Sequence, residues 1–434
     1  MRISLPYPEM SPIDVPEKNI LGIFSPSIVK IEESENQIIE KAFSHPVRSV
    51  PLEQLLSGHE NILIVVDDHT RATPVKKILP RLLWELETAG IQSSHIKFLI
   101  ALGTHRPMTE EEIIKKFGED IPKQYSIFNH QWWNPSQLIQ QGETERGTPI
   151  FVNRMVREVD FIIGIGQIVP HRVSGFSGGA NIIQPGICGE QTTGKTHWLS
   201  AQFPGREILG KIENPVKEEI EKVAQKVGLN WIINTIQDGS ERLIEVVAGD
   251  PFDAYREGAR RSREVYQSIL PSEADIVIAD SFPYDSELWL ATKGIYASEL
   301  AVRQGGVVIL ITLCPEGVSP SHPEVLELGY QTFEEVDQKV RQGMITKLTA
   351  AAHLVHGGRV IKERAKGIMV SQGISKEQTE RLGFLYAKTP QEALEIGFSL
   401  AGRDAKVAIL QRGGEILPIV KEKIKTKSNA EEMI

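Results

Sequence analysis

Histidines and glycines are concentrated in one stretch of the chain, residues 171–197, with the sequence HRVSGFSGGANIIQPGICGEQTTGKTH. A neutral imidazole is a common metal ligand, and near neutral pH it also acts as a general acid or base. Glycines let backbone N–H groups approach a phosphate closely. His171 and His197, at the two ends of this stretch, therefore indicate a site for a charged cofactor and a metal.

Ser177, Gly178 and Gly179 supply consecutive small residues within that stretch. Such a run suits a turn of backbone N–H groups that binds an anion, and it equally suits a tight turn that needs a positive φ. His197 is the candidate metal ligand. Because no second His, Cys or carboxylate stands at metal-ligand spacing from it, most ligands of such a metal would have to come from a group other than the protein.

A second group of polar residues follows the apolar run at 61–68, in the motif DHTRATP. Asp68, Thr70 and Arg71 place a carboxylate, a hydroxyl and a guanidinium on one turn. Arg71 would hold a carboxylate or a phosphate through two parallel hydrogen bonds. The alternative for these residues is a local salt bridge that caps the helix entered at Pro74.

His105, in the motif LGTHRP, follows another apolar run and precedes a helix start with the sequence TEEE. A histidine in this place is either a proton acceptor at the end of a strand or a loop side chain that hydrogen-bonds the backbone. His171 has the same two interpretations, and the glycine-rich run after it favours the first. Two histidines at adjacent strand ends would flank one substrate from opposite faces.

Short β-rich runs separated by helical segments would carry these residues. The sequence predicts strands at 61–68, 95–104, 160–168 and 231–236, and helices at 75–89, from Thr109 onward and at 251–269. Strands that alternate with helices are typical of βαβ units around a mainly parallel sheet. Because ligands of such sheets bind beyond the carboxyl ends of the strands, we expect the polar motifs to meet at one edge of the sheet.

The same pattern restarts after Pro271, with strands predicted at 274–281, 305–312 and 366–373. A chain of 434 residues is also too long for one hydrophobic core. We therefore expect two α/β domains with mainly parallel sheets and the active site in the cleft between them. The predicted boundaries are 1–270 for an N-terminal catalytic and cofactor-binding domain, 271–420 for a C-terminal domain, and 421–434 for a charged, disordered tail.

Composition and charge exclude several classes of protein. The net charge of −9 argues against a nucleic-acid partner, for which a clustered basic face is expected. Cys188 and Cys314 fit neither a disulfide framework nor a metal-binding pair, which indicates a reducing compartment. The N-terminal MRISLPYPEM is not typical of a signal peptide, and the apolar runs are too short to span a membrane. We expect a cytoplasmic protein with no nucleic-acid or membrane partner.

The segment from Gly189 to Thr196, GEQTTGKT, matches the phosphate-binding P-loop pattern. A P-loop follows a buried strand, whereas the preceding NIIQPGIC is broken by Pro185 and Gly186. A P-loop nucleotide-hydrolysing enzyme is therefore an alternative function with an unfavourable local context.

The motifs DHTRATP (68–74), LGTHRP (102–107), PHRVSGFSGGA (170–180) and PGI (185–187), together with His197, resemble the nickel-dependent lactate racemase family. Each motif alone is common, and their order and strand-end placement make the combination specific. The similarity extends through the N-terminal two thirds of the chain in its residues, and through the C-terminal part in its layout.

The resemblance implies an isomerase, a racemase or epimerase of a 2-hydroxy acid. Its cofactor would be a nickel pincer nucleotide, Ni held by pyridinium-3,5-bisthiocarboxylic acid mononucleotide, which proteins of cofactor synthesis would load. The resemblance implies that one histidine removes the hydroxyl proton while the C2 hydrogen leaves as hydride to the cofactor, and that the 2-keto acid receives the hydride on its other face. His105 and His171 would be the acid/base pair and His197 the nickel ligand. The cofactor would lie against Asp68, Thr70, Arg71, Ser177, Gly178 and Gly179.

Asn181 departs from the family pattern, in which a lysine at this position is joined covalently to the cofactor. An amide side chain cannot form that thioamide bond. Asn181 therefore implies non-covalent binding, a different cofactor, or a catalytically altered homologue that only binds a cofactor. Because a mere carrier does not need paired acid/base groups, we expect an enzyme whose cofactor is held without a covalent bond and lies against Asn181.

The segment FPYDSELWLATKG, residues 282–294, also differs from the family. With the family's substrate-holding tyrosine and lysine aligned to Phe282 and Ser286, a fixed cation is lost and hydroxyl groups are gained. We expect a small-molecule substrate other than lactate, a longer, hydroxylated or sugar-derived 2-hydroxy acid. The candidate substrate residues are Arg71, Tyr284, Ser286 and Lys293.

Overall fold

The computed structural model describes residues 1–421, and its chain divides into two compact units. The N-terminal unit consists of residues 28–199 and 211–265, and the C-terminal unit of residues 1–27, 200–210 and 266 onward. Apart from Lys421, the predicted tail 421–434 lies outside the described residues. None of the helices within residues 1–421 has the length and apolar character needed to cross a membrane.

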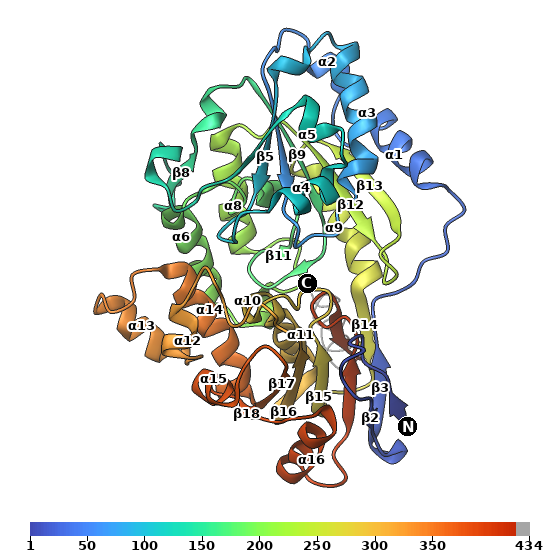
Figure 1. Cartoon of the computed structure of the whole chain (residues 1–434), viewed down its shortest axis with the longest axis vertical. Helices are drawn as coiled ribbons and strands as arrows, with labels where there is room; N and C mark the ends of the chain where they lie inside the picture. The colour runs from blue at the N-terminus through green and yellow to red at the C-terminus, as the bar shows by residue number, and fades with distance from the viewer. Residues whose placement is uncertain (422–434) are drawn as a thin grey trace, which may run out of the picture. The chain divides into compact units, whose positions relative to one another are not determined.

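A six-stranded sheet with the order β13-β12-β9-β4-β5-β6 forms the centre of the N-terminal unit (Figure 1). β13 is antiparallel to β12, and every other pair of neighbours is parallel. The six strands are β4 (Ile62–Asp67), β5 (Ile96–Ala101), β6 (Ser126–Asn129), β9 (Phe161–Gln167), β12 (Trp231–Gln237) and β13 (Leu243–Gly249). Shorter strands outside this sheet are β7 (Leu138–Glu143), β8 (Pro149–Asn153), β10 (Pro170–His171) and β11 (Gly175–Phe176).

Helices cover both faces of this sheet, which explains why β4 is buried at every position of its sequence ILIVVD. The apolar residues of α3 recur at helical spacing and pack in one core with those of α1 and the sheet. A 3-10 turn at Gly179–Ile182 packs on the opposite face, against β4 and β9. The helices are α1 (Glu35–Ser44), α2 (Leu52–Leu55), α3 (Val75–Thr88), α4 (Glu110–Phe117), α5 (Ile121–Gln124), α6 (Glu190–Ala201), α8 (Pro215–Val227) and α9 (Asp253–Tyr266).

The C-terminal unit contains a second six-stranded sheet, parallel throughout, in the order β18-β17-β16-β15-β19-β3. These strands are β3 (Ile20–Phe24), β15 (Ala274–Asp280), β16 (Val302–Thr312), β17 (Ala365–Ser371), β18 (Leu385–Tyr386) and β19 (Val407–Leu410). Two further pairs are formed by β1 (Arg2–Ile3) with β2 (Ile13–Asp14) and by β14 (Gln267–Leu270) with β20 (Leu417–Val420).

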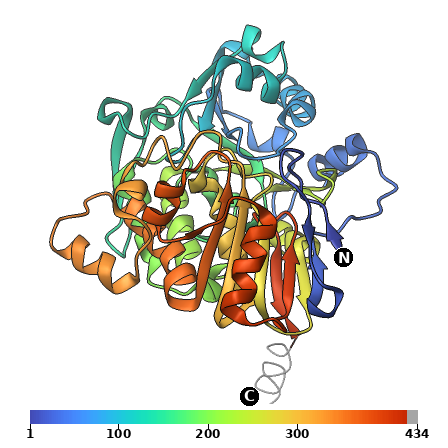
Figure 2. The same ribbon diagram turned by 60° about the horizontal axis from the view of Figure 1, so that its bottom comes forward.

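Helices flank this second sheet as well. α16 packs across β15, β16 and β17 (Figure 2), and α11 packs against β15 and β16. The helices of the C-terminal unit are α7 (Gly205–Ile208), α10 (Leu288–Ala291), α11 (Lys293–Ala301), α12 (Glu324–Leu328), α13 (Phe333–Arg341), α14 (Leu348–Gly358), α15 (Lys376–Leu382) and α16 (Pro390–Ala401).

The predicted fold class, two α/β units with mainly parallel sheets, is confirmed. The division of the chain differs from the predicted boundary at 270 in two respects. Residues 1–27 belong to the C-terminal unit, because β3 pairs with β19 and extends that sheet at its edge. Residues 200–210 also belong to this unit. Pairing between strands so distant in sequence leaves no signal in local periodicity.

Candidate active site

Three neighbouring strands of the N-terminal unit, in the order β9-β4-β5, end at the same edge of the sheet because they are parallel. The loop after β4 carries Asp68, Thr70 and Arg71, the loop after β5 carries His105, and β9 leads into β10 with His171. The sequence therefore predicted correctly that these motifs start from adjacent strand ends.

His105 is paired with Asp68. The Nδ1 atom of His105 lies 2.6 Å from Oδ2 of Asp68, and the other carboxylate oxygen accepts from the backbone N–H of Thr70 at 3.0 Å and from its hydroxyl at 2.6 Å. Burial raises the pKa of Asp68, but the adjacent His105 charge and hydrogen bond outweigh this and hold that pKa well below its usual range. Asp68 is thus an ionised acceptor that fixes the proton of neutral His105 on Nδ1.

Arg71 and a lysine on α4 stabilise the same loop. Arg71 Nη1 donates to the Thr70 hydroxyl at 2.8 Å, and the positive charge of Arg71 helps to lower the pKa of Asp68. These interactions within one turn are of the kind expected from the alternative of a local salt bridge. The half-buried Lys116 pairs with Asp67 Oδ1 at 2.8 Å and donates to the carbonyl oxygens of Asp68 at 2.7 Å and Arg71 at 3.1 Å. Lys116 therefore holds the turn together with Arg71.

His171 and Asn181 differ from their neighbours in accessibility. From Phe161 to Gln184 every residue is buried except these two, which are half-buried. His171 Nδ1 lies 3.0 Å from the hydroxyl of Ser174, and this hydroxyl also accepts from Asn181 Nδ2 at 3.1 Å. The buried loop therefore exposes one imidazole and one amide, linked through a serine.

Ser177, Gly178 and Gly179 take part in hydrogen bonds and packing inside the unit. The Ser177 hydroxyl donates to the Gln167 carbonyl at 2.8 Å, and the Gly179 N–H donates to Asn234 Oδ1 at 2.7 Å. Gly178 has a φ of 83° and Gly179 of 58°, and a Cβ on Gly179 would lie 2.8 Å from the Tyr255 side chain. These contacts support the alternative of a tight turn at positive φ.

Asn181 also contacts a lysine from α8. Lys217 Nζ donates to Asn181 Oδ1 at 2.7 Å and to the Gly178 carbonyl at 3.0 Å, and it lies 3.4 Å from the centre of the Tyr255 ring. The Lys217 side chain is buried, which lowers its pKa, while Glu221 opposes that shift. A lysine amine is therefore present beside position 181, although the residue at 181 is an amide.

His197 lies in the middle of α6, and its Nδ1 is 2.9 Å from the Thr193 carbonyl oxygen. Because a carbonyl only accepts, the Nδ1 of His197 carries the proton and Nε2 keeps its lone pair. Burial, with a smaller contribution from the nearby His105, lowers the pKa of His197 to about 4. His197 is therefore neutral at pH 7, the state that a metal ligand requires.

The P-loop pattern is not a phosphate site in this fold. Gly194, Lys195 and Thr196 lie inside helix α6, and Lys195 is exposed. The Thr196 hydroxyl donates to the Thr193 carbonyl and accepts from Gln184. A P-loop needs its glycines in a loop before the helix, so this segment cannot enclose a phosphate.

Two family profiles and a curated relative match the chain. The lactate racemase N-terminal domain matches residues 8–208, and the lactate racemase C-terminal domain matches residues 269–417. A lactate racemase from Thermoanaerobacterium thermosaccharolyticum is 30% identical over an alignment of 438 positions that covers 97% of this chain and 99% of the relative. The chain belongs to the lactate racemase family.

Other relatives agree with this assignment. A lactate racemase from Lactiplantibacillus plantarum is 28% identical over 88% of this chain and 90% of its own length. The solved structure of the lactate racemase apoprotein from Thermoanaerobacterium thermosaccharolyticum has a TM-score of 0.86 and 28% identity, covering 96% of this chain and 100% of that one. A Thermotoga maritima protein, with a TM-score of 0.74, 22% identity and coverage of 89% and 98%, shows the shared fold alone.

As a member of the lactate racemase family, the chain is an isomerase of the racemase type, and the family uses a nickel-based cofactor. In residues 1–421 there is no group of three or more His, Cys, Asp or Glu side chains placed to hold a metal. His197 is the single residue that the sequence proposed as a ligand, and its geometry fits that role.

In the C-terminal unit of this racemase, the predicted substrate residues lie around the start of α11. Lys293 Nζ is 3.2 Å from the centre of the Tyr284 ring, and the buried Tyr284 hydroxyl donates to Glu415 at 3.4 Å. The Ser286 carbonyl accepts from the Glu316 N–H at 2.8 Å. Lys293 and Ser286 are half-buried, so they are the more accessible members of the predicted set.

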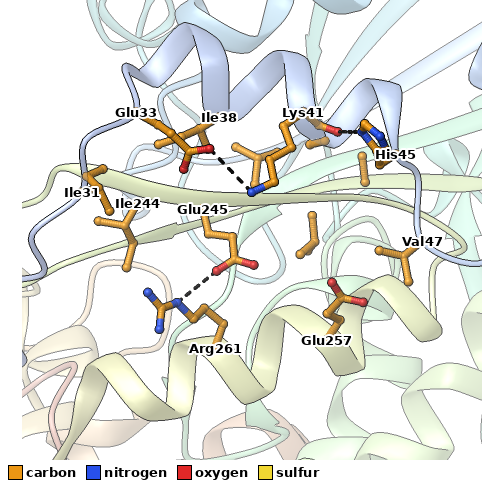
Figure 3. Close-up of a pocket in the computed structure, with 14 residues that line it drawn as sticks. Ile31, Glu33, Ile38, Lys41, His45, Val47, Ile244, Glu245, Glu257 and Arg261 are labelled. Carbon is orange, nitrogen blue, oxygen red and sulfur yellow. Dashed lines mark hydrogen bonds and ion pairs between the residues drawn. The ribbon is translucent and has the colours of Figure 1, made fainter.

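A separate pocket of the N-terminal unit lies between α1, β13 and α9 (Figure 3). Four of its charged side chains form two ion pairs, Lys41 with Glu33 at 3.6 Å and Arg261 with Glu245 at 3.0 Å. None of the predicted site residues lines this pocket.

Sequence reasoning missed Ser174, Lys116 and Lys217 as parts of the site. Lys217 had a detectable signal, because it shares an apolar helical stripe with Ile220 and Ala224 on α8 and is therefore placed on a buried face. Ser174 and Lys116 act through contacts with residues that other segments supply, and local sequence does not specify those contacts.

Proposed function

We propose that this racemase inverts the carbinol carbon of a 2-hydroxy acid and uses a nickel pincer nucleotide held without a covalent bond. The observation that carries the proposal is a shared geometry of His105, His171 and His197. Each has Nδ1 within hydrogen-bond distance of an oxygen atom of the protein. A ring fixed through Nδ1 presents Nε2 for proton transfer or metal binding.

The donor set fits nickel at His197. The imidazole is neutral at pH 7, its Nδ1 is bound to the Thr193 carbonyl, and its side chain is half-buried rather than enclosed. A carbonyl partner on Nδ1 orients the ring and raises the basicity of the ligating nitrogen. His197 would therefore hold the metal through Nε2.

The residues do not fit the covalent link of the family. Asn181 stands at the lysine position, and both ends of its amide are hydrogen-bonded, to Lys217 and to Ser174. Lys217 donates its own protons to Asn181 and Gly178. The cofactor would be retained by the nickel bond to His197 and by polar contacts, with Arg71 and Thr70 as the candidates for its anionic groups.

When bound, the nickel pincer nucleotide supplies an acceptor and donor for the hydrogen on C2. The protein residues then have two tasks, binding the substrate and moving the hydroxyl proton. His105 accepts this proton on Nε2, and Asp68 stabilises the resulting imidazolium through the 2.6 Å hydrogen bond. His171 performs the same proton transfer for the other enantiomer.

The substrate carboxylate requires a cation, and Arg71 offers a guanidinium at the strand-end edge. From the C-terminal unit, we assign Lys293 and Ser286 to the remaining polar groups of the substrate. Lactate has one hydroxyl group, whereas a longer hydroxylated or sugar-derived acid would use both side chains. We therefore place the substrate in the longer class.

A racemisation assay over a panel of 2-hydroxy acids tests this function. The loaded enzyme should interconvert the stereoisomers of at least one longer hydroxy acid, with no change in oxidation state and with C2-deuterium retained in the product. Activity confined to lactate would contradict the substrate class. Loss of the label to solvent would contradict hydride transfer, and net oxidation that depends on added NAD would indicate a dehydrogenase.

A further inference from the structure

A chain of four polar side chains connects the interior of the N-terminal unit to His171. Lys217 Nζ is 2.7 Å from Asn181 Oδ1, Asn181 Nδ2 is 3.1 Å from Ser174 Oγ, and Ser174 Oγ is 3.0 Å from His171 Nδ1. Lys217 and Ser174 are buried, and Asn181 and His171 are half-buried. None of these three hydrogen bonds is among the contacts proposed above for nickel or for the substrate.

We propose that Lys217, Asn181 and Ser174 are positioning residues that fix the proton of neutral His171 on Nδ1. The inference rests on the proposed function only in treating His171 as an acid/base residue. It assigns Asn181 a role in the reaction that does not require contact with the cofactor.

Donor and acceptor capacities determine the direction of each hydrogen bond. In its ammonium form, which the charge of Glu221 favours, Lys217 has three protons and no lone pair, so the Asn181 atom facing it is the carbonyl oxygen. The opposite end of the amide is then the NH₂ group, which can only donate to Ser174 Oγ. Lys217 thereby prevents a flip of the Asn181 side-chain amide that would exchange the positions of Oδ1 and Nδ2.

The Ser174 hydroxyl has a single proton, and the Phe176 carbonyl oxygen lies 2.8 Å from it. A carbonyl oxygen can only accept, so the proton of Ser174 belongs to this bond. The remaining lone pair of Ser174 Oγ faces His171 Nδ1, which must then be the donor. The Nε2 atom of His171 keeps its lone pair, as a general base requires.

One neighbouring group favours the opposite tautomer. The backbone N–H of Ser174 lies 3.3 Å from His171 Nδ1, and it would donate there if Nδ1 carried no proton. This contact is longer than the 3.0 Å contact to the hydroxyl. Removing the hydroxyl while the N–H stays in place should therefore invert the tautomer.

Nuclear magnetic resonance of the full chain with ¹⁵N-labelled histidine tests the inference without cofactor or substrate. A His171→Gln variant identifies the signals of His171. The wild type should show protonated Nδ1 and unprotonated Nε2 at neutral pH. Ser174→Ala should move the proton to Nε2, and Asn181→Leu or Lys217→Met should give a mixture of the two states.

Two controls separate this effect from a general disturbance of the fold. Ser262→Ala removes a buried hydroxyl that donates to the Ile168 carbonyl at 2.8 Å, and it should leave the His171 signals unchanged. The His105 signals, which depend on Asp68, should stay constant in all these variants.

After the cofactor has been loaded, Ser174→Ala should lower kcat about 100-fold with little change in KM.

A wild-type His171 protonated on Nε2 would overturn the inference. It would also be overturned if Asn181→Leu, a change at a half-buried position, left the Nδ1 proton fully in place. These outcomes do not depend on which reaction the enzyme catalyses. Absence of racemisation with the expected tautomer would refute the proposed function alone.

Discussion

The Nδ1 atom of His105 lies 2.6 Å from Oδ2 of Asp68, a shorter contact than the one between His171 and its serine partner. The carboxylate is buried and stays ionised, so it orients the imidazole and stabilises its charged form. His171 has a hydroxyl partner at 3.0 Å in place of a carboxylate. The imidazolium form of His105 is therefore stabilised by a negative charge, whereas His171 has only a neutral hydroxyl as its partner on Nδ1.

Replacing Asp68 by Asn should lower kcat of the loaded enzyme by about 100-fold or more, because an amide donates to Nδ1 as readily as it accepts. KM should change little, since the substrate contacts do not involve this carboxylate. Steady-state kinetics with Asp160→Asn as the control checks this. Asp160 accepts from the Glu60 and Asn61 N–H groups, and these residues precede β9 and β4, whereas the site residues follow the opposite ends of these strands. Half or more of the wild-type kcat in Asp68→Asn would contradict the role of the pair.

Replacing Asn181 by Lys should not restore the family's site in this chain, because a second amine would stand beside Lys217. Like charges in a buried site repel, and we expect a loss of about 1–3 kcal/mol in the free energy of unfolding. Adding Lys217→Met should recover most of that loss. Urea unfolding of the two single variants and the double variant measures the coupling energy between positions 181 and 217. If the changes in unfolding free energy of the single variants add up to that of the double variant, the two amines do not repel each other.

Lys195→Ala should leave racemisation unchanged, and neither this variant nor the wild type should bind ATP. Lys195 is an exposed residue inside α6, so its amine has no enclosed phosphate to contact. Calorimetric titration with Mg²⁺-ATP measures binding. Micromolar affinity that disappears in Lys195→Ala would revive the P-loop interpretation.

His130 should make the fold sensitive to acid. Burial lowers the pKa of His130 to about 4 from an ordinary value of 6.5, so between these values the unfolded chain binds a proton that the folded chain does not. Stability is complete above pH 6.5 and falls as the pH decreases toward 4. We expect a loss of about 2 kcal/mol between pH 7 and pH 5.

The matched variant for this prediction is His130→Gln, whose amide can still donate to the Cys188 carbonyl that His130 Nε2 contacts at 3.0 Å. The difference in urea-unfolding free energy between wild type and variant should shrink as the pH falls. An equal pH dependence in both proteins would show that His130 titrates normally in the folded chain.

Local sequence predicted much of the fold and the placement of the candidate site residues after the strands β4, β5 and β9. The run at 61–68 is apolar because β4 is covered on both faces, and polar residues begin where the strand ends, so the sequence pattern alone puts Asp68 at a strand end. His105 and His171 follow from the same reasoning on β5 and β9. Glycines were less informative, since anion binding and a positive φ select the same residue.

Contacts between distant segments could not be predicted in this way. Lys217 and Asn181 are 36 residues apart, and their hydrogen bond depends on how α8 packs against the turn at Gly179–Ile182. The strand β3 joins a sheet whose other strands begin more than 240 residues later, at Ala274. Such pairings result from tertiary packing rather than from periodicity.

Mass spectrometry and nickel analysis of protein co-expressed with cofactor-synthesis enzymes test the central claim most directly. Under native conditions we predict one nickel per chain and a mass increment equal to the pincer nucleotide. The increment should vanish on denaturation, because Asn181 forms no thioamide, and His197→Ala should lose the nickel. An increment that survives denaturation would contradict non-covalent binding. Folded protein with neither nickel nor increment would contradict the cofactor itself.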